Sequence, residues 1–303
     1  MRRISIALGL LAACVAMLSA FAGTASAAEE LPELGRCLKN EPTLEGKKKV
    51  YSGQFANKKC TRAARKPGHG KYEWLPGPGK NAEFYGGSEE PNPTFVTTKG
   101  ETFTCQSAFF KGTYTGAKTA KASIALSGCE EGEAPKTFGC SSNPLKEGEA
   151  EVTELEMTLG QIKADPKKPR VGWKFSKTGT WATLLCGHFP SVEKLEPPEI
   201  NAVRALEGSV IGELTKGFFG TNLNHMSRYQ VFRFQQLKGV QVPLSFEGEE
   251  AQNTLTDTVT HGATGTPGKE QTGFATTTET RSGPGGNLEE PEKEEELEIK
   301  TIP

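Results

Sequence analysis

Beyond residue 100, hydrophobic and polar positions alternate in short runs that turn residues interrupt. The clearest run, "AEVTELEMTLGQI" at 150–162, sets Val152, Glu154 and Glu156 against Thr153, Leu155 and Met157. A period of two is typical of a half-buried strand, and the runs at 102–110, 122–129, 203–214 and 228–237 predict further strands. Because convincing amphipathic helices are few, the pattern predicts an all-β fold, an antiparallel sandwich or barrel-like sheets with little helix.

Two patterns near the C-terminus predict further extended structure. Residues 252–281 are rich in threonine, and four threonines alternate between 254 and 260. We interpret them as the solvated face of a strand and not as an array that matches a regular ligand surface. The segment "ELEIKTIP" at 296–303 also alternates, which predicts a final strand added to a sheet.

The first 27 residues have the pattern of a secretory signal peptide. Two arginines precede an apolar run at 4–21, and "ASAA" at 25–28 offers a cleavage site after Ala27. The alternative is a lipobox, "LAAC", which would leave Cys14 lipidated, but the residues that follow it stay apolar. We therefore expect a secreted, extracellular protein with no later transmembrane segment, and lipid anchoring at Cys14 as the minor alternative.

Composition divides the rest of the chain into three segments. We expect a basic N-terminal segment (28–100), a central β domain (101–215) and a threonine-rich β region with an acidic end (216–303). The alternative is one continuous domain from 28 to 303, because a chain of this length can form either one large core or two smaller ones.

Six cysteines follow the signal peptide: Cys37, Cys60, Cys105, Cys129, Cys140 and Cys186. An even number in an exported chain is typical of a disulfide framework. Short spacing favours Cys37–Cys60 and Cys129–Cys140, which leaves Cys105–Cys186 as a long-range bridge. No C-x-x-C pair occurs, so we expect no metal site at these cysteines.

Charge is spread unevenly along a chain whose formal net charge is −1. Residues 36–80 hold 12 Lys or Arg against three Glu, whereas residues 289–298 hold seven Glu and one Lys. Such a basic block can attract an anionic polymer, with Lys47, Lys48 and Lys49 as candidate contacts. The interpretation that we favour is a solvated loop closed by a disulfide and facing the acidic end. The total charge implies no nucleic-acid partner.

The stretch "KYEWLPGPGK" at 71–80 places two large aromatic residues two positions apart. In an extended segment Tyr72 and Trp74 share one face, which can stack on sugar rings. The alternative, which we favour, is that burial of both rings anchors the end of a strand in a core, with the prolines ending that strand. Trp173 and Trp181 lie in strand-like runs and are expected in the core.

Motifs for catalysis are absent from the sequence. The four histidines are isolated, and neither a nucleophile elbow nor a phosphate-binding glycine loop occurs. Asp165 and Asp257 are the only aspartates, which disfavours calcium loops. We therefore expect no catalytic residues and no cofactor. A pair of glutamates that the fold brings together leaves no spacing signature, and this is the enzymatic alternative.

Several motifs follow one another along the mature chain: "ELPELGRC", "YSGQFANKKC", "GKYEWLPG", "FTCQSAFFKGTYTG", "SGC", "FGC" and "EELEIKTI". Their order resembles a family of uncharacterised secreted proteins that occur in multiple copies in soil actinobacteria. The resemblance implies export and a shared β fold held by disulfides. It implies no catalytic residues, because that family has no established activity.

These patterns together predict a secreted, non-catalytic binding or structural protein of the cell envelope or extracellular space, with a cell-wall polymer or an extracellular glycan as its partner. The alternative is a secreted carbohydrate-active hydrolase that uses a glutamate pair. Neither the ligand nor the oligomeric state follows from the sequence.

Overall fold

The computed structural model describes residues 31–80, 82–133, 136–143, 146–163, 167–189, 197–216, 223–250, 254–262, 265–282 and 296–301. The expected signal peptide, Cys14, Asp165 and most of the acidic run lie outside these residues. Within them every regular element is a strand, which confirms the prediction of an all-β protein. No helix in this part of the chain has the length and hydrophobicity needed to cross a bilayer.

The strands follow one another closely along the chain. The N-terminal part contains β1 (Glu33–Lys39), β2 (Thr43–Glu45), β3 (Lys48–Val50) and β4 (Tyr72–Pro76). Next come β5 (Glu83–Thr97), β6 (Thr102–Thr104), β7 (Ser107–Tyr114), β8 (Thr119–Ser127), β9 (Glu130–Glu133) and β10 (Lys136–Ser141). Three long strands follow, β11 (Ala150–Lys163), β12 (Arg170–His188) and β13 (Glu199–Thr215). The last are β14 (Tyr229–Leu237), β15 (Val240–Val242), β16 (Ser245–Phe246), β17 (Glu249–Glu250), β18 (Thr256–His261), β19 (Gly268–Ser282) and β20 (Glu298–Lys300).

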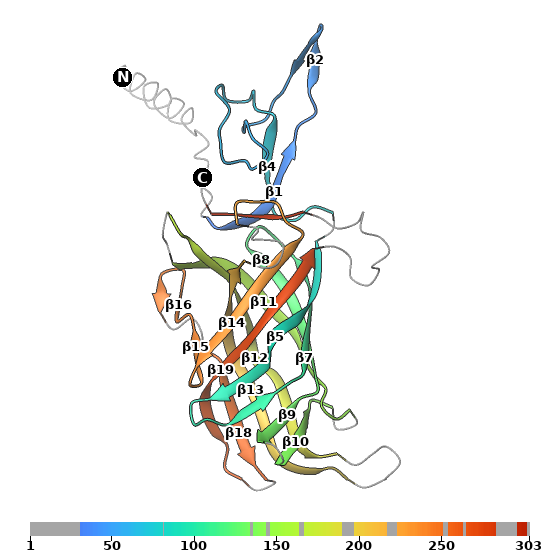
Figure 1. Cartoon of the computed structure of the whole chain (residues 1–303), viewed down its shortest axis with the longest axis vertical. Coiled ribbons are helices and arrows are strands. Elements are labelled where there is room, and N and C mark those ends of the chain that lie inside the picture. Colours follow the sequence, from blue (N-terminus) through green and yellow to red (C-terminus); the bar gives the residue numbers. More distant parts are fainter. Residues whose placement is uncertain are drawn as a thin grey trace, which may run out of the picture. The chain divides into compact units, whose positions relative to one another are not determined.

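Eight of these strands close into an antiparallel barrel (Figure 1). Pairing runs from β5 through β7, β8, β11, β12, β13, β18 and β19 and returns to β5. A closed barrel leaves no unpaired edge in its wall, which protects the sheet from pairing with other chains. Strands from all three expected segments contribute to this one barrel.

The long strands of the barrel change partners along their length. One half of β5 pairs with β7 through residues 83–87, and the other half pairs with β6 through residues 94–96. Likewise β13 pairs with β14 through residues 213–215 and with β18 through residues 202–207. The other strands therefore complete the wall in two tiers around β5, β12, β13 and β19. One tier uses β7, β8, β11 and β14, and the other uses β6, β9, β10 and β18.

Three disulfides join the described residues: Cys37–Cys60, Cys105–Cys129 and Cys140–Cys186. The first confirms the predicted pair, whereas the predicted Cys129–Cys140 and Cys105–Cys186 bridges are wrong. Cys105 lies where β6 passes into β7, and Cys129 lies where β8 passes into β9, so their bridge joins two points at which the chain changes tier. Cys140 lies directly opposite Cys186 in the register of β10 and β12. Cross-strand register, and not spacing along the chain, therefore selects both pairs.

Aromatic side chains fill the interior of the barrel. Phe110 and Phe234 stack with their ring centroids 6.1 Å apart, and Phe234 lies 5.0 Å from Phe274. Trp173 is fully buried, and its indole N–H donates a hydrogen bond of 3.1 Å to the Gln230 side chain. Burial of each such ring stabilises the fold by about 2–3 kcal/mol. The interior is thus a packed core, so a ligand has the outer surface available to it.

A bulge in β11 changes the expected alternation. Glu154 has a φ of 59°, and the register with β8 shifts between Val152 and Leu155. Val152 and Leu155 are both buried as a result, although the sequence pattern placed them on opposite faces. That part of the prediction is wrong, because one extra residue turns the rest of the strand over.

A separate three-stranded sheet has the order β20-β1-β4. β20 pairs antiparallel with β1, with Leu34 opposite Ile299, which agrees with the prediction of a final strand added to a sheet. On the other side of β1, Cys37 lies opposite Trp74 of β4. The Leu34 N–H also donates a 2.7 Å hydrogen bond to the Ala117 carbonyl, in the turn between β7 and β8. The two ends of the described chain are therefore joined in one sheet.

Candidate ligand-binding surface

Trp74 lies in a small core and not on a surface. Its side chain is 8% exposed and packs with Phe55, Tyr72 and the Cys37–Cys60 disulfide. Its indole N–H donates a hydrogen bond to the Glu33 carboxylate. Tyr72 lies on the same face of β4 and is half-buried. The pair therefore anchors the strand, and Trp74 does not present an exposed face; a role of the two rings in binding stays a prediction.

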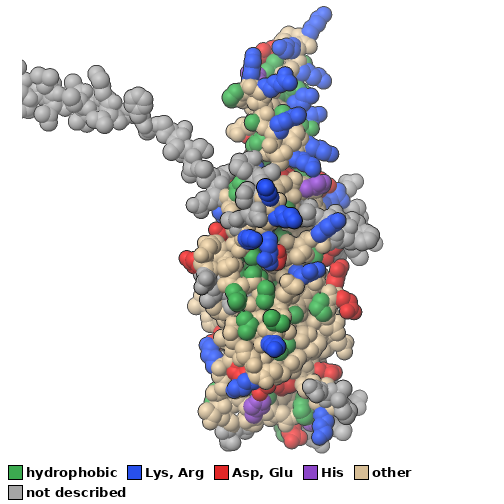
Figure 2. Space-filling view, turned by 60° about the vertical axis from the view of Figure 1, so that its left-hand side comes forward, with side chains coloured by type: hydrophobic (Ala, Val, Ile, Leu, Met, Phe, Trp, Pro, Cys, Tyr) green, Lys and Arg blue, Asp and Glu red, His purple; other side chains and the backbone are tan. Residues whose placement is uncertain are grey.

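Lys47, Lys48 and Lys49 are exposed on the hairpin of β2 and β3. No contact given by the described residues joins them to Tyr72 or Trp74, so the structure does not bring the five predicted ligand contacts into one site. Other Lys and Arg side chains gather over the same part of the chain (Figure 2). A role for the three lysines in binding stays a prediction.

A buried ion network, which the sequence analysis missed, lies within the barrel. Arg204 is fully buried and pairs with Asp257, Glu131 and Glu101, of which Asp257 is also fully buried. Burial raises the pKa of Asp257 to about 6, although the adjacent guanidinium acts in the opposite direction. His261 Nε2 lies 3.2 Å from a Glu101 carboxylate oxygen. The carboxylates surround the arginine and not an open cavity, so we assign this network to the structure of the barrel.

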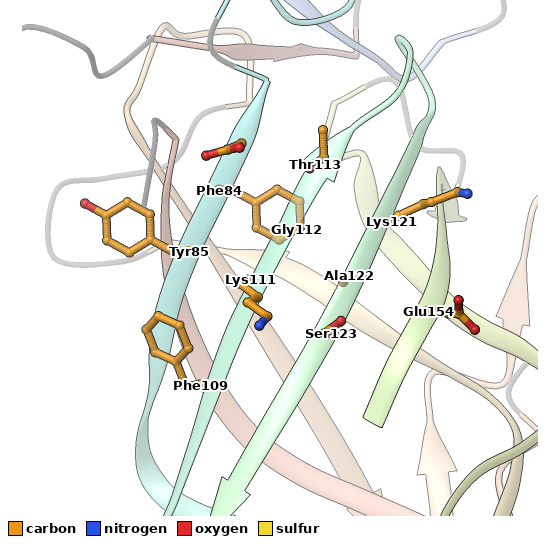
Figure 3. Close-up of a pocket in the computed structure, with 11 residues that line it drawn as sticks. Phe84, Tyr85, Phe109, Lys111, Gly112, Thr113, Lys121, Ala122, Ser123 and Glu154 are labelled. Atoms are coloured by element: carbon orange, nitrogen blue, oxygen red, sulfur yellow. The ribbon is translucent and has the colours of Figure 1, made fainter. Parts of the chain in front are cut away.

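An open hollow of about 620 Å³ lies on the outer wall of the barrel (Figure 3). It extends over β5, β7 and β8 to the bulge at Glu154 of β11. Gly112 and Ala122 form part of its floor, together with Phe84. A Cβ atom on Gly112 would lie only 2.3 Å from the Phe84 ring, so this position requires glycine.

Strand alternation directs an aromatic ring and a cation toward solvent beside this hollow. In β7 the side chains of Ala108, Phe110 and Tyr114 are buried, whereas Phe109 and Lys111 are exposed. Phe109 is 47% exposed, which is a large fraction for a phenylalanine. The period of two that fills the barrel therefore also builds the outer surface.

Outward side chains from five neighbouring strands form one row, here named the tyrosine row: Tyr229, Arg281, Tyr85, Lys111 and Ser123. Each lies directly opposite the next in the strand register. The Arg281 guanidinium lies 5.0 Å from the Tyr229 ring centroid and donates a 2.7 Å hydrogen bond to the Tyr229 hydroxyl. With strands about 4.8 Å apart, the row is about 19 Å long. It therefore alternates aromatic rings with cations across the wall.

A second hollow, of about 320 Å³, lies on the other side of Tyr85. Gly87 lines it, and a Cβ atom there would have no neighbour closer than 3.9 Å, so the missing side chain leaves open space. Glu89 and Glu279 also line this hollow. Burial, and then the charge of Glu89, raise the pKa of Glu279, while Arg281 lowers it. Tyr85 lines both hollows, which makes them parts of one surface.

Charged groups of both signs surround the two hollows. The cations are Lys111, Lys121 and Arg281, and the carboxylates are Glu83, Glu89, Glu154 and Glu279. A surface with mixed charges has no strong preference for an anion or a cation. It does offer many hydrogen-bond donors and acceptors next to aromatic rings, which suits a ligand rich in hydroxyl groups.

One cluster has the residue types of a metal site. Glu131, Cys140 and Cys186 lie close together, but the two cysteines form a disulfide and offer no thiolate to a metal. Elsewhere in the described chain no group of three or more metal-ligating side chains occurs.

Comparisons with protein-family models, curated proteins and solved structures find no match for this chain. The resemblance to secreted actinobacterial proteins therefore stays a prediction. Function has to be inferred from the surface itself. The residues of the tyrosine row were not among the predicted site residues, although Tyr229 lies in a run that the sequence analysis assigned to a strand.

Proposed function

We propose that this chain is an exported, non-catalytic binding protein of the cell envelope or extracellular space, and that it holds a glycan along the tyrosine row. The observation that supports the proposal is the alternation of aromatic rings and cations, in register, beside an open hollow of about 620 Å³. Aromatic faces can cover the apolar face of a sugar ring, and the flanking Lys, Arg, Ser and Tyr groups can bind its hydroxyls.

The shape of the surface favours a polymer over a small molecule. Small-molecule sites are concave and cover most of their ligand. Here the hollows are open, lie on both sides of Tyr85 and continue along a row of about 19 Å. A glycan chain can therefore extend along the row and contact several rings at once. Export is supported by the three disulfides, which persist in an oxidising compartment.

The alternative, a hydrolase with two glutamates, has a candidate pair among the described residues. Glu89 and Glu279 line the smaller hollow, and the pKa of Glu279 is raised. A glycosidase needs one protonated acid and one ionised carboxylate, so the shift of Glu279 has the required sign. However, Glu89 is exposed and the hollow is open to water, whereas catalysis is strongest in a water-excluded site. We therefore favour binding without turnover.

The test of the proposal is a pull-down of oxidised mature protein on isolated cell walls and insoluble neutral polysaccharides. We expect Tyr85→Ala combined with Phe109→Ala to weaken binding at least tenfold, which is about 1.4 kcal/mol and is typical of the loss of central aromatic contacts. Leu237→Ala removes another exposed apolar side chain, 69% exposed on β14, and is the matched control. Binding that the aromatic variant retains would refute the proposed site.

A second variant tests the same surface by adding volume. Gly87→Leu fills the smaller hollow without a backbone clash, because no atom lies within 3.9 Å of the new Cβ. Gly268→Leu in β19 is the matched control, since its Cβ would also meet its first neighbour at 3.9 Å and Gly268 lines neither hollow. We expect only Gly87→Leu to block binding. Release of soluble sugar by the wild type, lost in Glu279→Gln, would instead favour the hydrolase.

A further inference from the structure

A second surface, chemically unlike the tyrosine row, lies in the N-terminal part of the chain. We name it the basic surface, and its exposed members are Lys39, Lys47, Lys48, Lys49, Lys58, Lys59, Arg62, Arg65, Lys66, Lys71 and Lys80. Figure 2 shows these side-chain types gathered over this part of the molecule. Residues 36–80 carry 12 Lys or Arg against three Glu, so the remaining chain has 36 − 12 = 24 basic and 37 − 3 = 34 acidic residues. The positive charge is therefore concentrated in one short segment.

The cations of the basic surface lack the partners that cations on the barrel have. On the barrel Arg170 pairs with Glu213, and Lys269 pairs with Glu207 at 2.8 Å. Among the residues that the structure describes, no ion pair involves any member of the basic surface. Like charges that outnumber the nearby counter-charges repel one another, and this repulsion opposes folding. An external anion would relieve it.

Packing does not explain the hairpin at the centre of this surface. No residue of β2 or β3 is buried, and the two strands pair only with each other. Gly46, with a φ of 65°, makes the turn that presents the three consecutive lysines. An isolated two-stranded hairpin is only marginally stable in water. Contact with a ligand is a role that this exposed, lysine-rich hairpin can fulfil.

The loop that carries the other cations is well ordered by its own contacts. The Cys37–Cys60 disulfide ties it to β1, and Phe55 exchanges two backbone hydrogen bonds with Tyr72, of 2.9 and 3.0 Å. The Asn57 side chain donates to the Thr61 hydroxyl at 2.9 Å. A preorganised array of cations loses less conformational entropy when it binds than a flexible one.

We propose that the basic surface binds an anionic polysaccharide, a glycan chain that carries repeated carboxylate, sulfate or phosphate groups. Many weak charge contacts along such a polymer add up, and each releases counterions. Single-stranded nucleic acid is disfavoured because its recognition needs exposed aromatic rings, whereas Tyr51 of this segment lies under Lys71, 5.7 Å from its Nζ. This surface is independent of the tyrosine row and binds by charge where that row binds by stacking.

The test is binding of the oxidised mature protein to immobilised heparin and polygalacturonate, with dextran as the neutral control, over a range of salt concentrations. We expect the triple variant Lys47→Gln, Lys48→Gln, Lys49→Gln to bind the acidic polymers at least tenfold more weakly at low salt. The slope of log Kd against log salt should fall by roughly two, if each lost contact contributes about 0.7–0.9 as in other polyanion complexes.

Two controls separate charge position from total charge and from folding. A triple Gln variant at the exposed barrel residues Lys136, Lys163 and Lys216 removes the same charge and should bind normally. Arg in place of all three hairpin lysines should retain binding.

Equal loss in both Gln variants, salt-independent binding or equal affinity for dextran would overturn the proposal. Preferential binding to DNA or to anionic vesicles would overturn the assignment to a polysaccharide. The Tyr85 and Phe109 variant should leave heparin binding intact, so failure of one surface does not imply failure of the other.

Discussion

Replacing Glu298 with glutamine is expected to stabilise the protein at pH 8 and to have almost no effect at pH 4. Glu298 lies in β20 and is fully buried, and neither carboxylate oxygen has a hydrogen-bond partner among the described residues. Burial raises the pKa of Glu298 from 4.5 to about 7, although the positive charges of Lys300 and Lys59 act against this rise.

The sign follows from proton binding. An acid with a folded-state pKa above its unfolded-state pKa holds its proton more tightly in the native protein, so its ionisation opposes folding. The unfavourable contribution is close to zero well below pH 4.5, grows as the pH rises through 7 and is nearly constant above pH 8. At about 1.4 kcal/mol per pKa unit it reaches about 3 kcal/mol at pH 8 and about 0.2 kcal/mol at pH 4. The glutamine amide is also buried, so about 3 kcal/mol is an upper limit.

The assay is denaturant unfolding of the wild type and Glu298→Gln at pH 4, 6 and 8, followed by tryptophan fluorescence, because Trp74 belongs to the same sheet. Glu296→Gln is the matched control, since its side chain is 54% exposed and it removes the same charge two residues away. If the three-stranded sheet opens before the barrel unfolds, hydrogen exchange at the Ile299 amide detects that opening. A difference between wild type and Glu298→Gln that is the same at pH 4 and pH 8 would refute the reasoning.

Three further substitutions test the barrel. Arg204→Met should lower the free energy of unfolding, measured in urea, by about 3–5 kcal/mol at pH 8 and by less at pH 5, where Asp257 is protonated. Adding Asp257→Leu should restore most of the lost stability. A double variant as unstable as Arg204→Met alone would contradict this. Gly112→Ala should lower stability in thermal unfolding by about 1–3 kcal/mol because its Cβ overlaps Phe84, and an unchanged melting temperature would argue against the clash. Glu154→Gly should raise the free energy of unfolding by about 1 kcal/mol because the φ of 59° suits glycine. A lower melting temperature in thermal unfolding would contradict this reasoning.

The class of fold could be predicted because one face of each long barrel strand is buried. The run at 228–237 alternates visibly, and it forms β14. Closure of the barrel could not be predicted, because it depends on which strands become neighbours, and long strands such as β12 have different neighbours at their two ends. The disulfides show the same limit. Cys140 and Cys186 meet because two strands pair in one register, and nothing in their spacing of 46 residues signals this.

Much less of the candidate site could be predicted. Phe109 and Phe110 are adjacent and chemically identical, so only the phase of β7 reveals which of them is exposed. The four alternating threonines between 254 and 260 carried more information about burial than we used. An outward face of threonines implies an inward face at the intervening positions, and these include Asp257, whose burial required Arg204 from another strand. Sequence patterning thus carries the in-or-out alternation within a strand, but not the partner that each side chain meets.

The two proposed surfaces differ in how their binding responds to salt, so one salt titration can distinguish them. Charge contacts at the basic surface weaken as salt rises, because the screening length falls from about 10 Å at 0.1 M to about 3 Å at 1 M. Stacking on Tyr85 and Phe109 depends on apolar burial and is not screened in this way. A rise in salt should therefore release an acidic polymer from the basic surface, whereas a neutral glycan on the tyrosine row should stay bound.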